Sequence, residues 1–345
     1  MKKCAVVLFN LGGPSDLKSV RPFLFNLFND PYIIQLPSFL RYLVARLISW
    51  RRAPIAQEIY SEMGGKSPIV EQTDKQAKAL EKKLGPGYKV FFVMRYWHPR
   101  ADEVLKKVRA YNPEEVVLLP LYPQFSSTTS LSSLDEWAKT QQWLKKDQWQ
   151  TRIIRSYSKL QGLISYFTKA IESKLKNVRE ISNCRVLFSA HGLPEKVISA
   201  GDPYQKQIIE TAQAIQQNLP QEIDFLVTYQ SRVGPLKWLD PYTDQEIIRA
   251  GQEGKELIVV PIAFVSEHSE TLVELDIEYR ELAEKSGVVS YHRVNTPQDD
   301  PEFIASLADM IKDAHKKPFE SGCYPCLRES CPKKLRSPKV CCMSR

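Results

Sequence analysis

The sequence contains no apolar run long enough to cross a lipid bilayer. Its longest such stretch, Ile258–Val265, is far shorter than the roughly 20 residues that a spanning helix needs. A secretory or transit peptide is also missing, because Met-Lys-Lys leads directly into the strand-like segment 5–9. We therefore expect a cytoplasmic protein.

The net positive charge is small outside the C-terminal end of the chain. The formal net charge is +8, and residues 316–345 hold eight Lys or Arg and only two Glu. The rest of the chain is therefore close to neutral, and it shows no basic stripe of the kind that nucleic-acid binding requires. We expect no nucleic-acid partner. The basic tail is compatible with contact to an anionic lipid surface and equally with simple solvation.

The glycine-rich loop of nucleotide-binding proteins is absent as well. Gly12-Gly13-Pro14 follows a strand-like segment, but the spacing G-x-G-x-x-G is not present. This observation argues against nucleotide binding.

What the sequence does contain is a series of short apolar segments that alternate with helical stretches. These segments do not alternate in polarity, which is typical of buried parallel strands; they are residues 5–9, 89–93, 115–119, 185–189, 224–228 and 256–265. The pattern predicts an α/β fold, and the two halves of the chain resemble one another. We predict two similar doubly wound domains with parallel sheets facing a central cleft. They cover residues 1–150 and 151–320, followed by a basic, cysteine-rich tail over residues 321–345.

Polar side chains gather where the predicted strands end, which is where ligands bind in open α/β sheets. His191 follows one strand, and His268 opens a helix after the last one. That helix carries a row of carboxylates spaced three or four residues apart, and so on one face: Glu267, Glu270, Glu274 and Glu278. A row of carboxylates leading to a histidine suits the handling of a cation, a proton, or both.

Several motifs, taken in their order along residues 4–332, resemble those of the ferrochelatases. Members of this family insert ferrous iron into protoporphyrin IX. The motifs are Asn10-Leu11-Gly12-Gly13-Pro14, Gly64-Gly65-Lys66-Ser67-Pro68-Ile69, Arg95-Tyr96-Trp97-His98-Pro99, Tyr122-Pro123-Gln124-Phe125-Ser126, Ser189 to Pro194, Gln230 to Pro235, Trp238-Leu239 and Phe264 to Tyr279.

The resemblance implies roles for four residues in the predicted second domain. His191 corresponds to the family's histidine that faces the macrocycle, where it would accept a pyrrole proton or meet the incoming iron. Glu270 corresponds to the carboxylate opposite this histidine, so both residues are candidate contacts of the ferrous iron substrate. His268 and Glu274 correspond to the polar groups that support the pair.

The resemblance also implies residues that bind the porphyrin. Leu11, Tyr96 and Trp238 are candidates for the walls of the site, and Arg95 is a candidate partner of a propionate. The alternatives are that Trp238 is an ordinary core residue and that Arg95 belongs to a surface ion pair.

Segment 31–50 is unusually rich in apolar residues. Phe39, Leu40, Leu43 and Leu47 fall on one stripe of a predicted helix. The helix either packs in the core or forms an amphipathic lip that admits an apolar ligand and touches the inner face of the cytoplasmic membrane.

The seven cysteines divide into two groups. Cys4 and Cys184 lie beside predicted strands, where we expect buried thiols. The tail spacing C-x2-C-x4-C of Cys323, Cys326 and Cys331 favours metal or iron–sulfur ligation over disulfides in a cytosolic chain. It matches the triplet of the ferrochelatases that carry a [2Fe–2S] cluster. Tyr166 aligns with the fourth cysteine of those enzymes, so we expect Cys341 or Cys342 to supply the fourth thiolate. The alternatives are that the same thiolates bind zinc and that the tail binds no metal.

The sequence thus favours a ferrochelatase, a metal-inserting lyase that completes haem biosynthesis from protoporphyrin IX and ferrous iron. A coproporphyrin ferrochelatase and a non-catalytic haem or iron carrier, or iron–sulfur sensor, on the same fold are the alternatives. The His191–Glu270 combination favours an enzyme, and Leu11 together with segment 31–50 favours protoporphyrin. The sequence leaves the oligomeric state open, and an oligomer is compatible with it.

Overall fold

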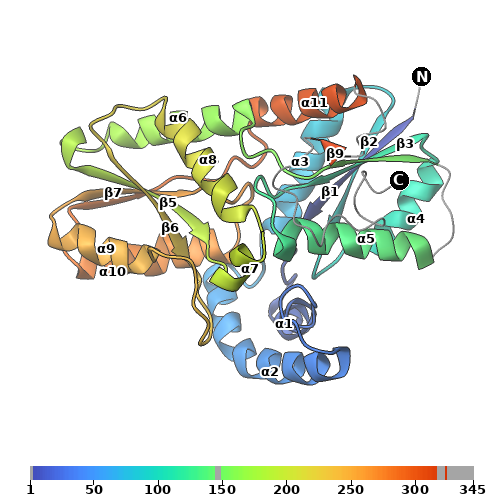
Figure 1. The fold of residues 1–345 in the computed structure, drawn as a ribbon, viewed down its shortest axis with the longest axis horizontal. Helices are drawn as coiled ribbons and strands as arrows, with labels where there is room; N and C mark the ends of the chain where they lie inside the picture. Colours follow the sequence, from blue (N-terminus) through green and yellow to red (C-terminus); the bar gives the residue numbers. More distant parts are fainter. Residues whose placement is uncertain (1–2, 144–148, 317–322, 325–345) are drawn as a thin grey trace. The chain divides into compact units, whose positions relative to one another are not determined.

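A computed structural model describes residues 3–143, 149–316 and 323–324 of the chain (Figure 1). These residues fall into two units, and each is described by itself. Unit 1 contains residues 3–143, 149–156, 308–316 and 323–324, and unit 2 contains residues 157–307. Both units are parallel sheets with flanking helices, so the predicted α/β class with two similar doubly wound parts is confirmed.

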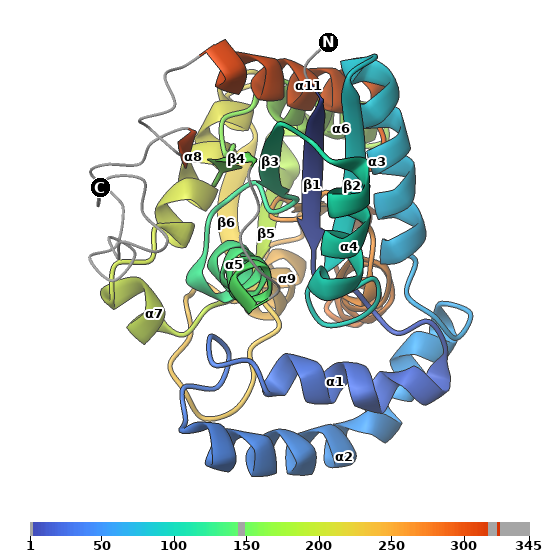
Figure 2. The same ribbon diagram turned by 90° about the vertical axis from the view of Figure 1, so that its right-hand side faces the viewer.

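The sheet of unit 1 has the strand order β2-β1-β3-β4-β9, and all of its pairs are parallel (Figure 2). Its strands are β1 (Cys4–Asn10), β2 (Tyr88–Met94), β3 (Glu115–Pro120), β4 (Gln150–Ile154) and β9 (Cys323–Tyr324). The first three confirm predicted segments. β4 begins with three polar residues and β9 has only two residues, so neither has the apolar signature on which the prediction depends.

Helices cover both faces of this sheet because its central strands are apolar on both sides. Ala5, Val7 and Phe9 of β1 pack in one cluster with α4 (Ala101–Tyr111) and α5 (Ser132–Trp143), where the rings of Phe9 and Trp137 meet edge to face. Helix α3 (Ile69–Leu84) also packs against β2. The end of α11 (Pro301–Lys316) reaches β1 through contact between His315 and Cys4.

Two helices precede α3, and they lie side by side in Figure 2. They are α1 (Val20–Phe28) and α2 (Ser38–Glu62). Helix α2 buries small residues such as Ala45 and Ser49, whereas Phe39 and Leu43 are 67% and 59% exposed. The apolar stripe of segment 31–50 is therefore at the surface, and its assignment to the core is wrong. Among the described residues, no helix is both long and apolar enough to cross a membrane.

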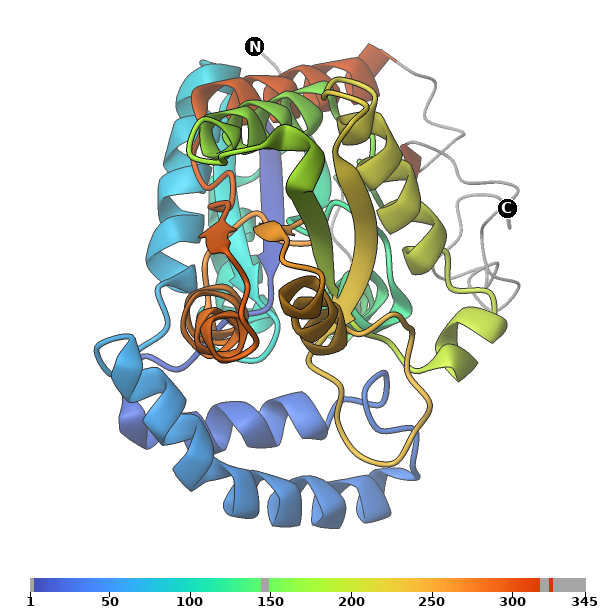
Figure 3. The same cartoon turned by 90° about the vertical axis from the view of Figure 1, so that its left-hand side faces the viewer.

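Unit 2 has a four-stranded parallel sheet in the order β6-β5-β7-β8 (Figure 3). Its strands are β5 (Cys184–His191), β6 (Asp224–Gln230), β7 (Glu256–Pro261) and β8 (Ser290–Arg293). Helices α6 (Gln161–Leu175) and α8 (Tyr204–Gln216) contact β7 and β6, and a core cluster joins the sheet to α9 (Thr243–Gln252) and α10 (Tyr279–Lys285).

Strand β7 is shorter than the predicted segment 256–265. It ends at Pro261, and the chain turns there, where the backbone N–H of Ile262 donates to Val260 O at 2.9 Å. Ile262 and Val265 nevertheless remain buried. The apolar run 256–265 therefore indicates which residues are buried, and it extends past the last residue of the strand.

The two sheets share strand order and register. Cys4 pairs with Glu115 at the start of β1 and β3, and Cys184 pairs with Glu256 at the start of β5 and β7. Counted from these cysteines, Leu11 and His191 occupy corresponding positions. Each unit also has a π-helix at a corresponding place. In unit 1, η2 (Ser127–Leu131) follows β3, and in unit 2, η4 (Glu270–Glu278) follows β7. The resemblance of the two halves of the sequence therefore extends to their three-dimensional structure.

Candidate functional site

His191 is the last residue of β5, the strand that lies between β6 and β7. The Tyr204 hydroxyl donates to the backbone carbonyl of His191 at 3.0 Å, and this contact fixes the strand end. The chain then turns at Gly192, whose N–H donates to Gln230 O at 2.9 Å. A Cβ at position 192 would lie only 2.9 Å from that same carbonyl oxygen, so glycine is required there.

The His191 ring contacts the Glu270 carboxylate. Nδ1 of His191 lies 2.9 Å from Oε2 of Glu270, and the two side chains are 37% and 25% exposed. Burial alone would lower the pKa of His191, but the negative charge and hydrogen bond of Glu270 outweigh it, so this pKa is raised. Burial likewise opposes ionisation of Glu270, yet His191 holds the pKa of this carboxyl well below its usual range. The two residues thus form a hydrogen-bonded imidazole–carboxylate pair whose imidazole remains partly accessible.

His268 lies behind this pair. The residue is buried, and its Nε2 is 4.0 Å from Oε1 of Glu270. Its ring packs against Phe264 with centroids 4.6 Å apart. Burial lowers the pKa of His268 despite the carboxylates of Glu270 and Glu267, so its imidazole is neutral near pH 7.

Glu274 lies one turn further along η4 and accepts hydrogen bonds from four donors. Gln230 Nε2 at 3.1 Å and the Ser231 hydroxyl donate to Oε2, while the Ser231 N–H at 3.0 Å and the Tyr279 hydroxyl at 3.1 Å donate to Oε1. Burial and the negative charge of Glu270 nevertheless raise the pKa of Glu274. The pKa values of Glu270 and Glu274 are therefore shifted in opposite directions, because His191 lowers the pKa of Glu270 most strongly.

The predicted row of four carboxylates is wrong at its first member. Glu267 precedes η4 and is buried, where both of its oxygens lie 3.1 Å from Arg293 Nη1 and the Thr296 N–H donates to Oε1 at 2.8 Å. The charge of Glu267 is therefore compensated by Arg293. Because η4 begins at Glu270, Glu267 does not share a helix face with it. Glu278, at the other end of η4, is exposed. A π-helix at this place also departs from the α-helical spacing that the sequence suggests, and such helices often occur at functional sites.

Trp238 lies on the long connection between β6 and α9, which Figure 3 shows in gold. Its indole N–H donates to Val233 O at 3.1 Å, and the residue forms an isolated bridge with Pro194. Because the added Cβ at Gly192 would meet the Trp238 ring at 3.3 Å, Trp238 lies against the turn that follows His191. It is only half-buried, so it is not an ordinary core residue.

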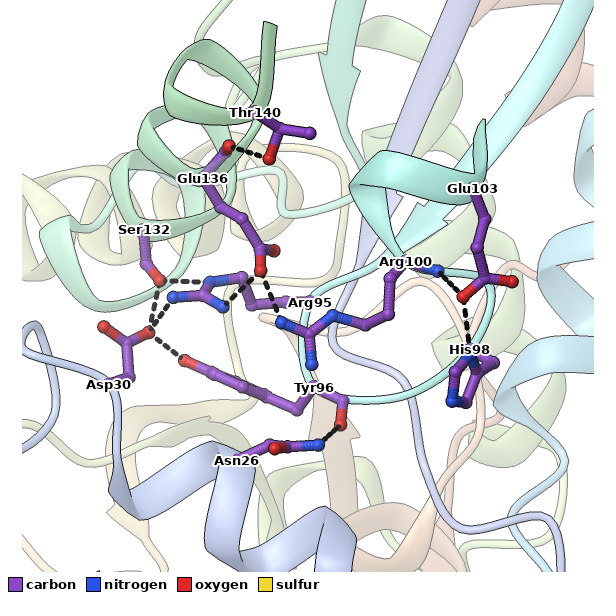
Figure 4. Close-up of polar contacts among 10 residues, drawn as sticks. All are labelled: Asn26, Asp30, Arg95, Tyr96, His98, Arg100, Glu103, Ser132, Glu136 and Thr140. Carbon is purple, nitrogen blue, oxygen red and sulfur yellow. Dashed lines mark hydrogen bonds and ion pairs between the residues drawn. The ribbon is translucent and has the colours of Figure 1, made fainter. Parts of the chain in front are cut away.

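The other three candidates belong to unit 1. Leu11 follows β1, is half-buried, and packs beside Tyr96. Tyr96 is 1% exposed and its hydroxyl donates to Asp30, while the Arg95 guanidinium pairs with Asp30 and Glu136 (Figure 4). Arg95 is thus held in an internal ion pair, and Tyr96 is covered on all sides.

Several polar residues around the site were not predicted to have a role. Gln230 and Ser231 bind Glu274, and they could have been found because Gln230 is the last residue of β6 and Ser231 follows it, at the same sheet edge as His191. Tyr204 is the first residue of α8, and Arg293 ends β8, a four-residue strand without an apolar run, so only the three-dimensional structure identifies them.

The cysteines confirm part of the sequence analysis. Cys4 and Cys184 are buried, 4% and 0% exposed. The Tyr166 hydroxyl donates to Thr296 O at 3.0 Å, so this side chain is already engaged within unit 2. Cys323 is described only as the backbone partner of Ile153 in β9. The remaining candidate cluster ligands, Cys326, Cys331, Cys341 and Cys342, lie outside the described residues.

A family model and curated proteins match nearly the whole chain. A family model described as Ferrochelatase matches residues 3–315. Over 331 residues the chain is 49% identical to a protein named Ferrochelatase from Pelagibacter ubique, covering 94% of this chain and 95% of that protein. Over 318 residues it is 53% identical to a protein of the same name from Caulobacter vibrioides, covering 91% and 90%.

A solved structure shares the fold at much lower sequence identity. It is the sirohydrochlorin chelatase SirB from Bacillus subtilis subspecies spizizenii in complex with cobalt, with a TM-score of 0.53, 10% identity, and coverage of 92% of this chain and 97% of that one. At this identity the likeness concerns the fold alone.

Proposed function

The chain belongs to the ferrochelatase family and inserts ferrous iron into protoporphyrin IX to form haem, and from this premise we propose that His191 and Glu270 act at its reacting centre. The observation that carries the proposal is the 2.9 Å contact between an accessible imidazole and a carboxylate at the end of the central strand of unit 2. Such a pair can hold a proton at one defined place.

Iron insertion releases two protons, because ferrous iron replaces the two N–H hydrogens of the porphyrin. His191 can accept the first of them whenever its imidazole is neutral, and its exposed edge allows the resulting imidazolium to return the proton to solvent before the next turnover. Glu270 stabilises the imidazolium that forms. His191 and Glu270 are also the residues proposed to meet the ferrous iron.

Glu274 is the proposed acceptor of the second proton. Its pKa is raised, so it binds a proton more readily than an ordinary glutamate does. The Tyr279 and Ser231 hydroxyls and the Gln230 amide keep its oxygens in place. Neutral His268 supports Glu270 from behind without adding a positive charge. Leu11 and Trp238 are the proposed apolar contacts of the macrocycle.

An anaerobic assay with ferrous iron and protoporphyrin IX tests this function. Loss of the free-base porphyrin spectrum at a rate proportional to the protein concentration is the expected result. A carrier would bind porphyrin or haem without turnover, and a protein that uses coproporphyrin in preference would show the higher kcat/KM for that substrate.

We also propose that the apolar face of α2 forms a lip that admits the porphyrin and touches the inner surface of the cytoplasmic membrane. Phe39, Leu43, Leu47 and Trp50 are each at least half exposed on this helix. Arg46 and Arg51 lie among them and are exposed too, so the helix offers both apolar and basic contacts to an anionic lipid surface.

The tail remains a further proposal, namely a [2Fe–2S] cluster held by Cys323, Cys326, Cys331 and either Cys341 or Cys342. Its support is the C-x2-C-x4-C spacing, together with two additional cysteines within reach of the triplet. Zinc bound by the same thiolates is the competing assignment.

A further inference from the structure

A buried carboxylate, Asp30, lies between α1 and α2 in unit 1. Its side chain is fully buried, although Ile33 and Leu36 on the same loop are partly exposed. Oδ2 of Asp30 accepts hydrogen bonds from Arg95 Nη2 at 2.9 Å and from the Tyr96 hydroxyl at 2.7 Å (Figure 4). The loop between the two helices is thereby attached to the segment that follows β2.

The same residue also binds helix α5 and its own loop. The Ser132 hydroxyl donates to Oδ2, and the Tyr32 N–H donates to Oδ1 at 2.9 Å. The backbone carbonyl of Asp30 accepts from Ile33 N–H at 3.1 Å and from Ile34 N–H at 2.9 Å. Asp30 therefore joins three parts of unit 1 and shapes the turn that leads into α2.

Arg95 has a partner within the protein for each of its three guanidinium nitrogens. Nη2 binds Asp30, Nε donates to the Ser132 hydroxyl at 2.7 Å, and Nη1 lies 3.2 Å from Glu136. Its side chain is only 12% exposed. A substrate carboxylate would have to displace one of these partners to form a paired contact with Arg95, at the cost of leaving a buried anion unpaired.

The position of α2 depends on this loop. Arg41 at the start of α2 donates from Nε to Asn29 O and from Nη1 to Leu36 O, both at 2.8 Å. The loop is therefore held at one end by Asp30 and at the other by Arg41. The exposed apolar residues of α2, such as Phe39, follow directly after it.

We propose that Asp30 is a positioning residue for porphyrin binding, and that Arg95 serves as its counter-ion and not as a receptor for a porphyrin propionate. Asp30 sets the place of the apolar α1–α2 segment relative to Leu11 at the end of β1. This inference rests on the proposed role of α2 as the porphyrin lip. It predicts that Asp30 affects the binding of the macrocycle and leaves the handling of iron unchanged.

The test compares Asp30→Asn and Arg95→Met with the wild type, using a porphyrin dicarboxylate and its dimethyl ester as substrates. Both variants should raise KM about tenfold, corresponding to one decade of binding affinity. The factor should be the same for the acid and the ester, while kcat and KM for ferrous iron stay within about twofold. The variant that carries both substitutions should raise KM for the porphyrin no more than either single variant does, because Asp30 and Arg95 act as one unit.

The possible results distinguish a failure of the Asp30 proposal from a failure of the proposed function. If Arg95→Met raises KM for the acid and not for the ester, Arg95 binds a propionate and the proposal fails. It also fails if Asp30→Asn leaves both KM values unchanged. Wild-type protein without iron insertion would instead overturn the proposed function, and porphyrin dissociation constants from tryptophan fluorescence would then still test Asp30.

Two control variants separate positioning from loss of stability. Glu115→Gln removes another buried anion, which is the first residue of β3 and pairs with Arg152 of β4 and His315 of α11. Glu115 lies beside Cys4 at the start of β1, whereas Leu11 follows the other end of that strand. The Glu115→Gln variant should lower the melting temperature without changing KM for porphyrin. If Asp30→Asn does not fold, Tyr96→Phe and Ser132→Ala each remove one donor to Asp30 and keep the charge pair; unchanged KM in both would contradict the proposal.

Discussion

At the scale of single residues, the protonation of His191 depends on one neighbour. Burial favours the neutral imidazole, whereas Glu270 at 2.9 Å favours the imidazolium and prevails. The proposed proton acceptor is thus protonated more readily than an ordinary histidine. Its capacity to act as a base therefore appears only as the pH rises through this raised pKa.

Replacing Glu270 by Gln should change the pH dependence in a defined direction. Without the negative charge, burial dominates and the pKa of His191 falls, so the acidic limb of kcat/KM should move to lower pH. Turnover at the optimum should fall about 10²-fold or more, because the imidazolium loses its partner. The measurement is the pH profile of iron insertion. A limb that stays in place, or moves to higher pH, would contradict the assignment of the base.

Replacing His191 by Ala should remove turnover while leaving the scaffold intact. Loss of a general base costs about 10²–10⁴-fold, and the side chain is 37% exposed, so little packing is lost. Anaerobic turnover, porphyrin fluorescence quenching and circular dichroism separate catalysis, binding and folding. Near-normal turnover would refute the role of His191.

At the scale of elements, η4 brings carboxylates of very different surroundings onto one helix. Glu270 and Glu274 are enclosed by donors, and Glu278 is exposed at the far end. Glu278→Gln should therefore reduce turnover only mildly, whereas Glu270→Gln should reduce it about 10²-fold or more. Steady-state rates of both variants at one pH decide this. Equal losses would mean that the carboxylates do not form a graded proton path.

Helix α2 allows a second test at this scale. Phe39, Leu40 and Leu43 replaced by Ser should raise KM for protoporphyrin and weaken liposome binding more than about tenfold, since each buried apolar side chain contributes ~1.5–3 kcal/mol. Because the three are exposed, the melting temperature should fall by less than about 4 °C. Ile209→Ser and Ile248→Ser, which alter exposed apolar residues of unit 2, should change neither quantity. A large drop in melting temperature would mean that the stripe supports the core.

At the scale of the whole molecule, the proposed cluster of the tail can be tested independently of iron insertion. Protein purified anaerobically should show the colour of a [2Fe–2S] cluster, and the double change Cys341→Ser and Cys342→Ser should remove it. Cys4→Ser and Cys184→Ser should keep the colour, since both thiols are buried in β-sheets. Colourless protein with one bound zinc would favour the zinc assignment, and protein with neither metal would contradict both.

The sequence predicts the parts of this fold that depend on apolar burial. The strands that contain Val7, Leu118 and Val259 are apolar on both faces, so the alternation of strands and helices is visible without a structure. The site residues at strand ends, such as His191, follow from the same rule. Asp30 does not, because its importance comes from Arg95 and Ser132, which lie 65 and 102 residues further along the chain.

The electrostatic details could not be predicted for a similar reason. Glu267 appears equivalent to Glu270 in the sequence, and only the buried Arg293 shows that its charge is already compensated. Arg95 likewise has the chemistry of a propionate receptor, but Asp30 and Glu136 occupy it. Burial and ion pairing between distant segments decide which charged side chains are free to serve a substrate.

The shared register of the two sheets has an evolutionary consequence. If the chain arose by joining two copies of one ancestral half, that ancestor had the same residue at the ends of the strands that became β1 and β5. One proton-accepting strand end is enough for one macrocycle, so the second copy was released from selection for a titratable side chain. On that history Leu11 and His191 descend from one inherited position, which holds the proposed apolar contact in one half and the proposed base in the other.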